Sequence, residues 1–183
     1  MQNIPIIKQV PLEYTRGIVR WAHPDGYFLN AQGQKVKHCF SPAHLKIPND
    51  PTRKTGKLYP YLRETVGSKA CHVLMALAFY GPRPTYVDKN GKEYVGFCHH
   101  LIPDPLDYKP ANLLCWLTKE EHAEADRRQR VLIKTLLERF PSDTKETVLR
   151  RLTYTQLREL QDPRKLSRER FDLIIEKFDI LTF

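Results

Sequence analysis

The sequence lacks the features that mark secreted, membrane-spanning and disordered proteins. No apolar run in its 183 residues approaches the length needed to cross a bilayer, and its first residues do not form a signal-peptide pattern. It contains no internal repeat and no low-complexity tract. With 41% hydrophobic and 28% charged residues, the composition is typical of a globular protein with a buried core. We therefore expect an intracellular, cytoplasmic protein without a membrane partner.

Paired cysteines are also missing. The four cysteines stand singly and form no Cys-x-x-Cys pair: Cys39, Cys71, Cys98 and Cys115. In an intracellular chain, isolated cysteines are usually small buried hydrophobic residues. The alternative is a structural zinc site built from Cys71, Cys98 and Cys115, which would make the chain a zinc-stabilised interaction module. Their spacing is not that of a zinc knuckle.

Positive charge is present in excess and is unevenly distributed. The formal net charge is +9. Up to Thr118 the chain has 15 Lys and Arg against 8 Asp and Glu, whereas from Lys119 onward it has 15 against 13. A basic front half favours a polyanionic partner such as nucleic acid, because lysine and arginine neutralise phosphates and release counterions. A basic surface without such a partner explains the same composition, so charge alone leaves both interpretations open.

Local patterns in the first half of the chain predict short strands followed by one helix. Turn-forming residues at 23–26 and 32–33 separate short strands, and residues 58–63 form a further strand that a proline weakens or places at an edge. Residues 73–80 are apolar on every side and end at a Gly-Pro pair, which favours a short buried helix over a strand. The sequence therefore predicts a β-rich N-terminal region over residues 1–66.

A hairpin and a further strand follow. The Asn90-Gly91 pair lies between residues 85–88 and 93–97, an arrangement typical of a two-stranded hairpin. Residues 113–117 are apolar and are expected to form a short buried strand. The fold class that these elements predict is α+β.

A long helix is expected after the last strand. Thr118 and Glu121 have the spacing of a capping box, in which each side chain binds the other residue's backbone amide. The helix therefore begins at Lys119. Its first half, up to Arg130, is polar and its second half is apolar, so we expect the second half to pack on protein and the first half to face solvent or ligand.

The end of the chain is predicted to be helical. Thr153 and Gln156 have the form of another capping box, and Ser167 precedes an amphipathic run from Arg168 to Ile180. The apolar stripe of this run is expected to pack against the rest of the chain. We expect three regions, a β-rich one, a core and a helical appendage, at residues 1–66, 67–138 and 139–183.

The most informative window contains three histidines and one asparagine in a fixed order. His99 and His100 are adjacent at the end of a strand, Asn112 follows after twelve residues, and His122 lies in the first turn of the long helix. Taken singly, the histidines can be polar surface residues and the asparagine a turn residue. Taken together, they provide imidazoles for a divalent ion, a free imidazole for proton transfer, and an amide that can pin the loop between two strands.

This set of groups suits the hydrolysis of a phosphodiester. The negative charge of the ester repels nucleophiles, and its leaving alkoxide is poor, so one divalent cation on the phosphate offsets both obstacles. A neutral imidazole, with an ordinary pKa of ~6.5, can take the proton of an attacking water near neutral pH. The amide dipoles at a helix N-terminus favour a bound phosphate in the same place.

The window resembles the HNH endonucleases, particularly the form found in phages and mobile elements. The resemblance covers roughly residues 58–122. Its elements are His72-Val73-Leu74-Met75-Ala76-Leu77-Ala78-Phe79, Gly81-Pro82-Arg83-Pro84, His99-His100, Leu106-Asp107-Tyr108-Lys109-Pro110-Ala111-Asn112-Leu113 and Trp116-Leu117-Thr118. It implies a ββα-metal core and the activity of a metal-dependent DNA endonuclease, with products that carry 5′-phosphate and 3′-hydroxyl ends.

The resemblance also implies roles for single residues. His100 falls on the general base, Asn112 on the loop-fixing asparagine, and His99 and His122 on the two metal ligands. The metal is a single divalent ion, and Mg, Mn, Ni and Zn all remain open. Glu121 is the alternative to His122, but we expect its carboxylate to be occupied in the capping box and to point away.

One lysine and three arginines near this window could contact the phosphates of DNA. Lys109, Arg127, Arg128 and Arg130 are candidate phosphate contacts, although a solvated basic face explains the three arginines equally well. We expect DNA as the partner and no small-molecule substrate, and the sequence does not predict an oligomeric state. The alternative function is a DNA-binding protein that keeps the HNH fold but cleaves weakly, which the presence of all four polar residues argues against.

Overall fold

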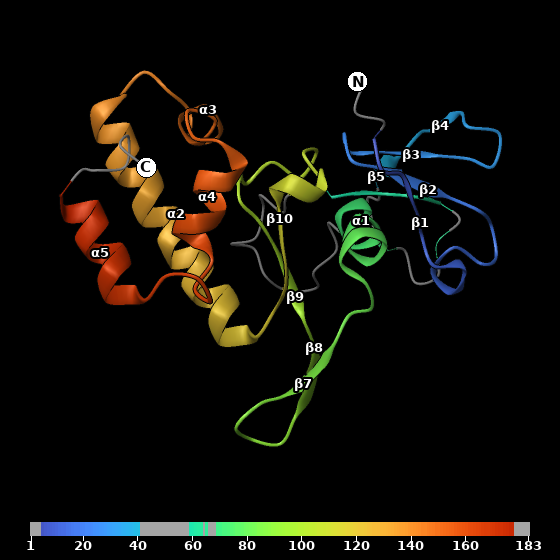
Figure 1. The fold of residues 1–183 in the computed structure, drawn as a ribbon, viewed down its shortest axis with the longest axis horizontal. Coiled ribbons are helices and arrows are strands. Elements are labelled where there is room, and N and C mark those ends of the chain that lie inside the picture. The colour runs from blue at the N-terminus through green and yellow to red at the C-terminus, as the bar shows by residue number, and fades with distance from the viewer. Residues whose placement is uncertain (1–4, 41–58, 64, 66–68, 178–183) are drawn as a thin grey trace, which may run out of the picture. The chain divides into compact units, whose positions relative to one another are not determined.

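The computed structural model describes residues 5–40, 59–63, 65 and 69–177. Its contacts divide the chain into two units. The N-terminal unit comprises Met1–Pro82 and Pro105–Pro110, and the C-terminal unit comprises Arg83–Asp104 and Ala111–Phe183. Each unit combines short antiparallel strands with helix, so the fold class is α+β, as the sequence predicts (Figure 1).

The N-terminal unit is built around a four-stranded antiparallel sheet. The strand order is β1-β2-β3-β4, and these strands span Lys8–Gln9, Trp21–His23, Tyr27–Leu29 and Lys35–Val36. The predicted turn at 23–26 joins β2 to β3 and brings His23 opposite Tyr27. Ala22 and Phe28, which also lie opposite each other, are buried in the core of this unit.

Shorter elements and one helix complete the N-terminal unit. They are η1 (Leu12–Tyr14), β5 (Cys39–Phe40), β6 (Pro60–Tyr61) and α1 (Cys71–Tyr80). The predicted strand at 58–63 is confirmed over the two residues of β6, which pairs with β5, and Leu58 lies outside the described residues. The predicted helix at 73–80 is confirmed and begins two residues earlier. It ends at Gly81, whose φ of 82° is readily adopted only by glycine.

The strands of the C-terminal unit form two antiparallel pairs. The predicted hairpin is β7 (Thr85–Val87) and β8 (Glu93–Val95). The second pair is β9 (Phe97–His100) and β10 (Leu113–Leu117), in which His99 lies opposite Leu114 and His100 opposite Leu113. The 3₁₀ turn η4 (Pro110–Asn112) leads directly into β10. The register of the second pair shifts at Trp116, whose φ of 61° is unusual for a residue with a side chain.

Four helices follow β10 in the part of the chain that the structure describes, and local capping signals fix where they begin. They are α2 (Lys119–Arg139), α3 (Lys145–Leu149), α4 (Tyr154–Gln161) and α5 (Arg168–Glu176). The predicted capping boxes at Thr118 and Thr153 are both present, and Ser167 caps α5 as expected. Residues 178–180 of the predicted last helix lie outside the described residues.

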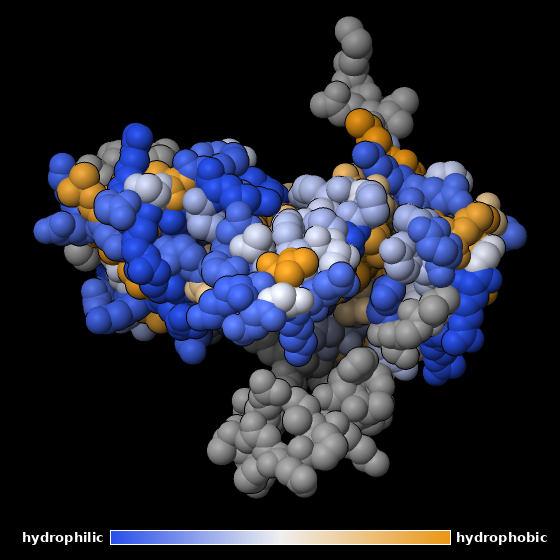
Figure 2. Space-filling model, turned by 90° about the horizontal axis from the view of Figure 1, so that it is seen from below, coloured by the Kyte–Doolittle hydropathy of each residue, from blue (hydrophilic) through white to orange (hydrophobic). Residues whose placement is uncertain are grey.

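The late helices share one hydrophobic core with α2 and the β9–β10 pair. Leu114 of β10, Leu132 of α2, Leu160 of α4 and Phe171 of α5 all belong to it. Burial of these side chains is what holds the elements together. On the face shown in Figure 2, the part formed by the helices is mainly hydrophilic, with scattered hydrophobic residues, consistent with a core inside.

The boundaries of the two observed units differ from those of the three regions expected from the sequence. Residues 139–177 belong to the same unit as α2 because they pack into its core, and α1 belongs to the N-terminal unit. None of the helices within the described residues is both long enough and apolar enough to cross a membrane.

Candidate metal centre

Three side chains of the C-terminal unit meet between β9 and the start of α2. Nδ1 of His99 lies 3.0 Å from Oδ1 of Asp126, and Nδ1 of His122 lies 3.5 Å from Oδ2 of the same carboxylate. The two imidazole rings are 5.6 Å apart between centroids and nearly perpendicular, at 83°. His99 is only 4% exposed, whereas His122 and Asp126 are partly open to solvent. The sequence expectation that His122 faces the strand end carrying His99 is met.

Local sequence explains why these groups meet. The capping box fixes the first turn of α2: the Glu121 amide donates to Oγ1 of Thr118 at 3.2 Å, and the Thr118 amide donates to Oε2 of Glu121 at 2.8 Å. The carboxylate of Glu121 is therefore occupied, as predicted. His122 and Asp126 are four residues apart on the helix and so lie on one face, toward β9.

The arrangement has the chemistry of a divalent-metal site. Each of His99, His122 and Asp126 offers one ligand atom, and these atoms all lie within 4.8 Å of one another. Two imidazole nitrogens and one carboxylate oxygen suit Zn, Ni or Mn, and leave positions for water or phosphate oxygens. Among the residues that the structure describes, no other group of three or more histidine, cysteine or carboxylate side chains is placed to share an ion.

The electrostatics of the cluster favour the metal-binding protonation states. Burial lowers the pKa of His122 below its usual range, and the neighbouring His99 adds to this effect against the opposing charge of Asp126. Burial alone would raise the pKa of Asp126, but the hydrogen bond with His99 and the nearby His122 and Arg130 outweigh it and lower that pKa. Near neutral pH the two residues are therefore a neutral imidazole and a carboxylate, the forms that coordinate metals.

Two buried amides hold the end of β9 in place. Oε1 of Gln161, from α4, lies 3.0 Å from Nε2 of His99, and the amide nitrogen of Gln161 donates to the Leu101 carbonyl at 3.0 Å. The amide nitrogen of Gln129 donates to the carbonyls of His100 at 2.6 Å and Leu101 at 2.9 Å. With Nε2 of His99 facing an amide oxygen, Nδ1 is the atom that this ring presents to the cluster.

Asn112 ties the two ends of the loop between β9 and β10. The Ile102 amide donates to Oδ1 of Asn112 at 2.8 Å, and Nδ2 of Asn112 donates to the Ile102 carbonyl at 3.2 Å. The Leu101 amide donates to the Asn112 carbonyl at 2.9 Å. Asn112 is fully buried, so its amide has the loop-fixing geometry expected from the sequence.

His100 lies directly beside the cluster in the chain but on the other face of β9. Successive side chains of a strand point to opposite faces, so His100 is directed away from the side on which His99 meets α2. The side chain is largely buried. Its backbone is held on both sides, by pairing with Leu113 and by the Gln129 amide on its carbonyl.

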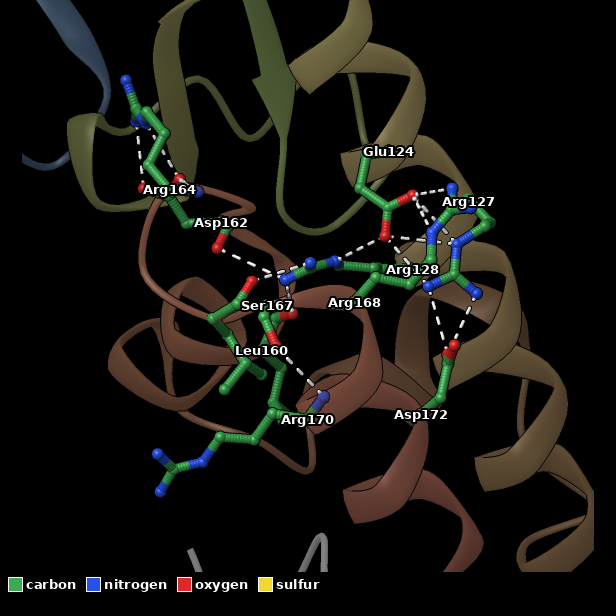
Figure 3. Close-up of polar contacts among 11 residues, drawn as sticks. Glu124, Arg127, Arg128, Leu160, Asp162, Arg164, Ser167, Arg168, Arg170 and Asp172 are labelled. Atoms are coloured by element: carbon green, nitrogen blue, oxygen red, sulfur yellow. Dashed lines mark hydrogen bonds and ion pairs between the residues drawn. The ribbon is translucent and has the colours of Figure 1, made fainter.

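Arg128, a candidate DNA contact, is an interior residue. Its side chain is 1% exposed, pairs with Glu124 at 2.9 Å and donates to the Leu166 carbonyl at 2.8 Å. Figure 3 shows Glu124 at the centre of a network that connects α2 with the start of α5, through Arg127, Arg128 and Arg168. The expectation that Arg128 binds phosphate is therefore wrong, because its guanidinium is consumed by this internal network.

The side chains of the other three candidate DNA contacts differ in their exposure to solvent and in their contacts with the rest of the protein. Arg127 is engaged by Glu124 and by Asp172 of α5. Arg130 is exposed, one turn beyond Asp126 on α2, and Lys109 belongs to the N-terminal unit, where its side chain packs on Gly26. The expectation that the polar first half of α2 faces solvent or ligand is thus only partly correct, since Arg128 and Gln129 point into the core.

The cysteines do not assemble a zinc site within the described residues. Cys98 and Cys115 face each other across β9 and β10 with their sulfurs 3.3 Å apart, and Cys71 belongs to the N-terminal unit. The hydrogen bond with Cys115 and burial raise the pKa of the Cys98 thiol well above its usual value, and burial raises the pKa of Cys71 to about 12. Within the described residues, no third ligand joins the Cys98–Cys115 pair, so the donor set of a structural zinc site is not assembled there.

Three residues of the centre were not expected from the sequence. Asp126 and Gln129 follow His122 at spacings of four and seven, the helical repeat that places all three on one face, and this signal was available. Gln161 has no such signal, because it reaches His99 from α4, 62 positions along the chain. None of the family models, curated proteins and solved structures compared with this chain matches it.

Proposed function

We propose that the protein is a metal-dependent DNA endonuclease whose site is of the ββα-metal, HNH type. The observation that carries the proposal is the His99–His122–Asp126 cluster, in which two imidazoles and a carboxylate converge at the start of a capped helix. Two features support it: the order of antiparallel strand, loop, strand and helix, and the buried Asn112 that ties the loop.

Two roles are proposed for the residues of the site: metal ligand and general base. His99, His122 and Asp126 would hold one divalent ion, and Gln161 would keep the His99 ring turned toward it. When bound, such an ion supplies Lewis-acid stabilisation of the charge on the scissile phosphate and on the leaving oxygen. His100 is the proposed general base, which takes the proton of the attacking water. It is not one of the ligand residues and points to the other face of β9, so this role requires the attacking water to lie at the end of the strand, within reach of its imidazole.

The backbone around the centre is suited to a phosphate. The helix α2 begins next to the start of β9, because Leu117, two residues before Lys119, pairs with Phe97, and a helix N-terminus favours an anion. Asn112 and Gln129 hold the carbonyls and amides that follow His100, so the base is attached to a fixed backbone. This fixed geometry is what positions a proton acceptor without further reorganisation.

The charge distribution supports DNA as the substrate. The N-terminal unit contains twelve Lys and Arg against five Asp and Glu, so it carries +7 of the formal net charge of +9. A polyanion with regularly spaced phosphates is the partner that such a surface favours. Because this term is blind to sequence, we expect binding to be strongly salt-dependent, falling by roughly 10³ or more between low and physiological salt if six or more phosphates are neutralised.

The test is plasmid cleavage by the purified protein. Supercoiled plasmid is incubated with the protein and EDTA, or with added Mg, Mn, Ni or Zn, and nicked and linear forms are measured. We expect conversion only with metal, and none by the His99→Ala protein. Cleavage that persists in EDTA, or no cleavage with any of the metals by protein that binds DNA, would contradict the proposal. The second result would favour a DNA-binding protein that has lost cleavage.

A further inference from the structure

A groove lies on the C-terminal half of α2, where this helix meets the first residue of α3. Its volume is about 480 Å³, in the range of ligand-sized clefts. Its lining combines an apolar floor with a charged rim and consists of Arg130, Ile133, Lys134, Leu137, Glu138 and Lys145. An apolar groove surrounded by cations is complementary to a ligand that has both a flat apolar part and an anionic part.

The rim is positively charged, and its cations are available. Arg130, Lys134 and Lys145 are exposed, and no hydrogen bond or ion pair joins any of the three to a side chain of the described residues, although Arg130 lies near enough to Asp126 to lower the pKa of that carboxyl. Glu138 is the one acid in the lining, so the groove carries a formal charge of +2. Cations left unpaired around an apolar floor are complementary to phosphates on either side of a base or sugar.

The groove continues the helix face that carries the metal cluster. His122, Asp126, Arg130, Ile133 and Leu137 follow one another at spacings of three and four, so they lie along one side of α2. At a rise of 1.5 Å per residue, the middle of the groove is roughly 10–12 Å from Asp126. This distance corresponds to about three nucleotides along one strand of duplex DNA, at roughly 3.4 Å each.

We propose that the groove binds an unpaired nucleotide of the DNA substrate, about three nucleotides from the cleaved phosphate. The proposal rests on the proposed function, which places a phosphodiester at the metal cluster. A base that is paired and stacked in a duplex hides its flat faces, whereas an unpaired base can lie on an apolar floor. Ile133 and Leu137 form that floor, and Arg130, Lys134 and Lys145 bind the flanking phosphates.

The test measures binding in EDTA, so that it does not depend on cleavage. Affinities are determined over a range of salt concentrations for a labelled duplex and for the same duplex with a short unpaired stretch. Two proteins change the groove: Leu137→Gln at the floor, and a triple change of Arg130, Lys134 and Lys145 to Gln at the rim. The matched control changes three exposed cations outside the groove to Gln: Lys89, Arg170 and Lys177.

We expect Leu137→Gln to weaken binding of the partly unpaired DNA about tenfold and to leave duplex binding within twofold. The triple rim change is expected to reduce the slope of log affinity against log salt by about 2 to 3 on the partly unpaired DNA, and the control by less than 1. The proposal is overturned if Leu137→Gln lowers the affinity for both DNAs equally. It is also overturned if the triple rim change alters the slope of log affinity against log salt no more than the control does. Cleavage by the wild type is scored separately, so DNA discrimination without cleavage contradicts only the proposed function.

Discussion

Nε2 of His99 lies 3.0 Å from Oε1 of Gln161, which comes 62 positions later in the chain. Both side chains are buried, and the second nitrogen of the imidazole faces Asp126. The α4 helix therefore contributes to the candidate metal centre without supplying a ligand. In the proposed site Gln161 would be a positioning residue, since its amide occupies Nε2 of His99 and leaves Nδ1 to face an ion.

Replacing Gln161 is expected to weaken metal binding. Gln161→Leu removes the amide oxygen that lies 3.0 Å from Nε2 of His99, so the ring loses a contact that orients it, and we expect metal affinity measured by calorimetry to fall about 10- to 100-fold. Gln156→Leu, on the same helix, removes a capping contact and no contact with His99, and it should keep wild-type affinity. Equal affinities in the two proteins would show that Gln161 has only a structural role.

Asp126 is expected to be the third ligand. Asp126→Asn keeps the shape of the side chain but removes the charge that a divalent ion needs, so we expect metal binding and metal-dependent cleavage to be lost, as with His99→Ala and His122→Ala. Glu121→Gln is the matched control, because that carboxylate is used in the capping box. Metal affinity that survives Asp126→Asn but not Glu121→Gln would reverse the assignment.

Removing the proposed base is expected to stop chemistry and leave binding intact. His100→Ala should keep metal and DNA affinities within a few-fold, because neither the ligand cluster nor the basic surface includes His100. We expect the single-turnover cleavage rate to fall by roughly 10²–10⁴. A His100→Ala protein that cleaves at the wild-type rate would contradict both the role and the reaction class.

Two arginines two positions apart are expected to behave in opposite ways. Arg128→Ala removes one of the three arginine donors to Glu124 and leaves the carbonyls of the α4–α5 segment without this donor, so we expect a loss of about 3–5 kcal/mol in the free energy of unfolding. Arg130→Ala changes an exposed side chain, and stability should stay within about 0.5 kcal/mol while DNA affinity falls. Urea unfolding and DNA titration of both proteins check this pair. Similar stability losses in the two would contradict the network described for Arg128.

The Glu124 network is expected to make stability depend on acid pH. Burial would raise the pKa of Glu124, but hydrogen bonds from Arg127, Arg168 and Arg128 outweigh it and hold that pKa far below its usual value. A carboxyl with a lowered pKa contributes stability above its unfolded pKa of ~4.3, and this contribution is lost as pH falls below that value.

Thermal unfolding measured from pH 6 to pH 3 compares wild type with Glu124→Gln. We expect the wild type to be more stable by about 3 kcal/mol at pH 6 and the difference to shrink as the solution is acidified. Glu159→Gln, which removes an exposed pair with Lys165, should cost less than about 1 kcal/mol. Parallel stability curves for wild type and Glu124→Gln would contradict the assignment.

Elements with local signals could be predicted from the sequence. The capping boxes at Thr118 and Thr153 predicted where α2 and α4 begin, and the Asn90-Gly91 pair predicted the β7–β8 hairpin. These signals work because caps and tight turns depend on side chains within a few residues of one another. The same locality placed His122 in the first turn of its helix, and hence near His99.

Features that depend on long-range packing could not be predicted. Arginine is usually a surface residue, and the burial of Arg128 is favourable because Glu124 and the carbonyls of the segment after α4 accept its hydrogen bonds. Gln161 meets His99 because α4 folds back onto α2, which no short pattern encodes. The division into two units likewise follows from contacts between distant segments, as with the late helices that share the core of α2.

The position of Gln161 in α4 has a consequence for incomplete chains. A product that stops after α2 would contain the three ligands, the proposed base and Asn112, but not the amide that orients His99. During synthesis, the candidate metal centre is assembled only after the chain has emerged past residue 161. Fragments that end before α4 are therefore expected to bind a divalent ion more weakly than chains that include it.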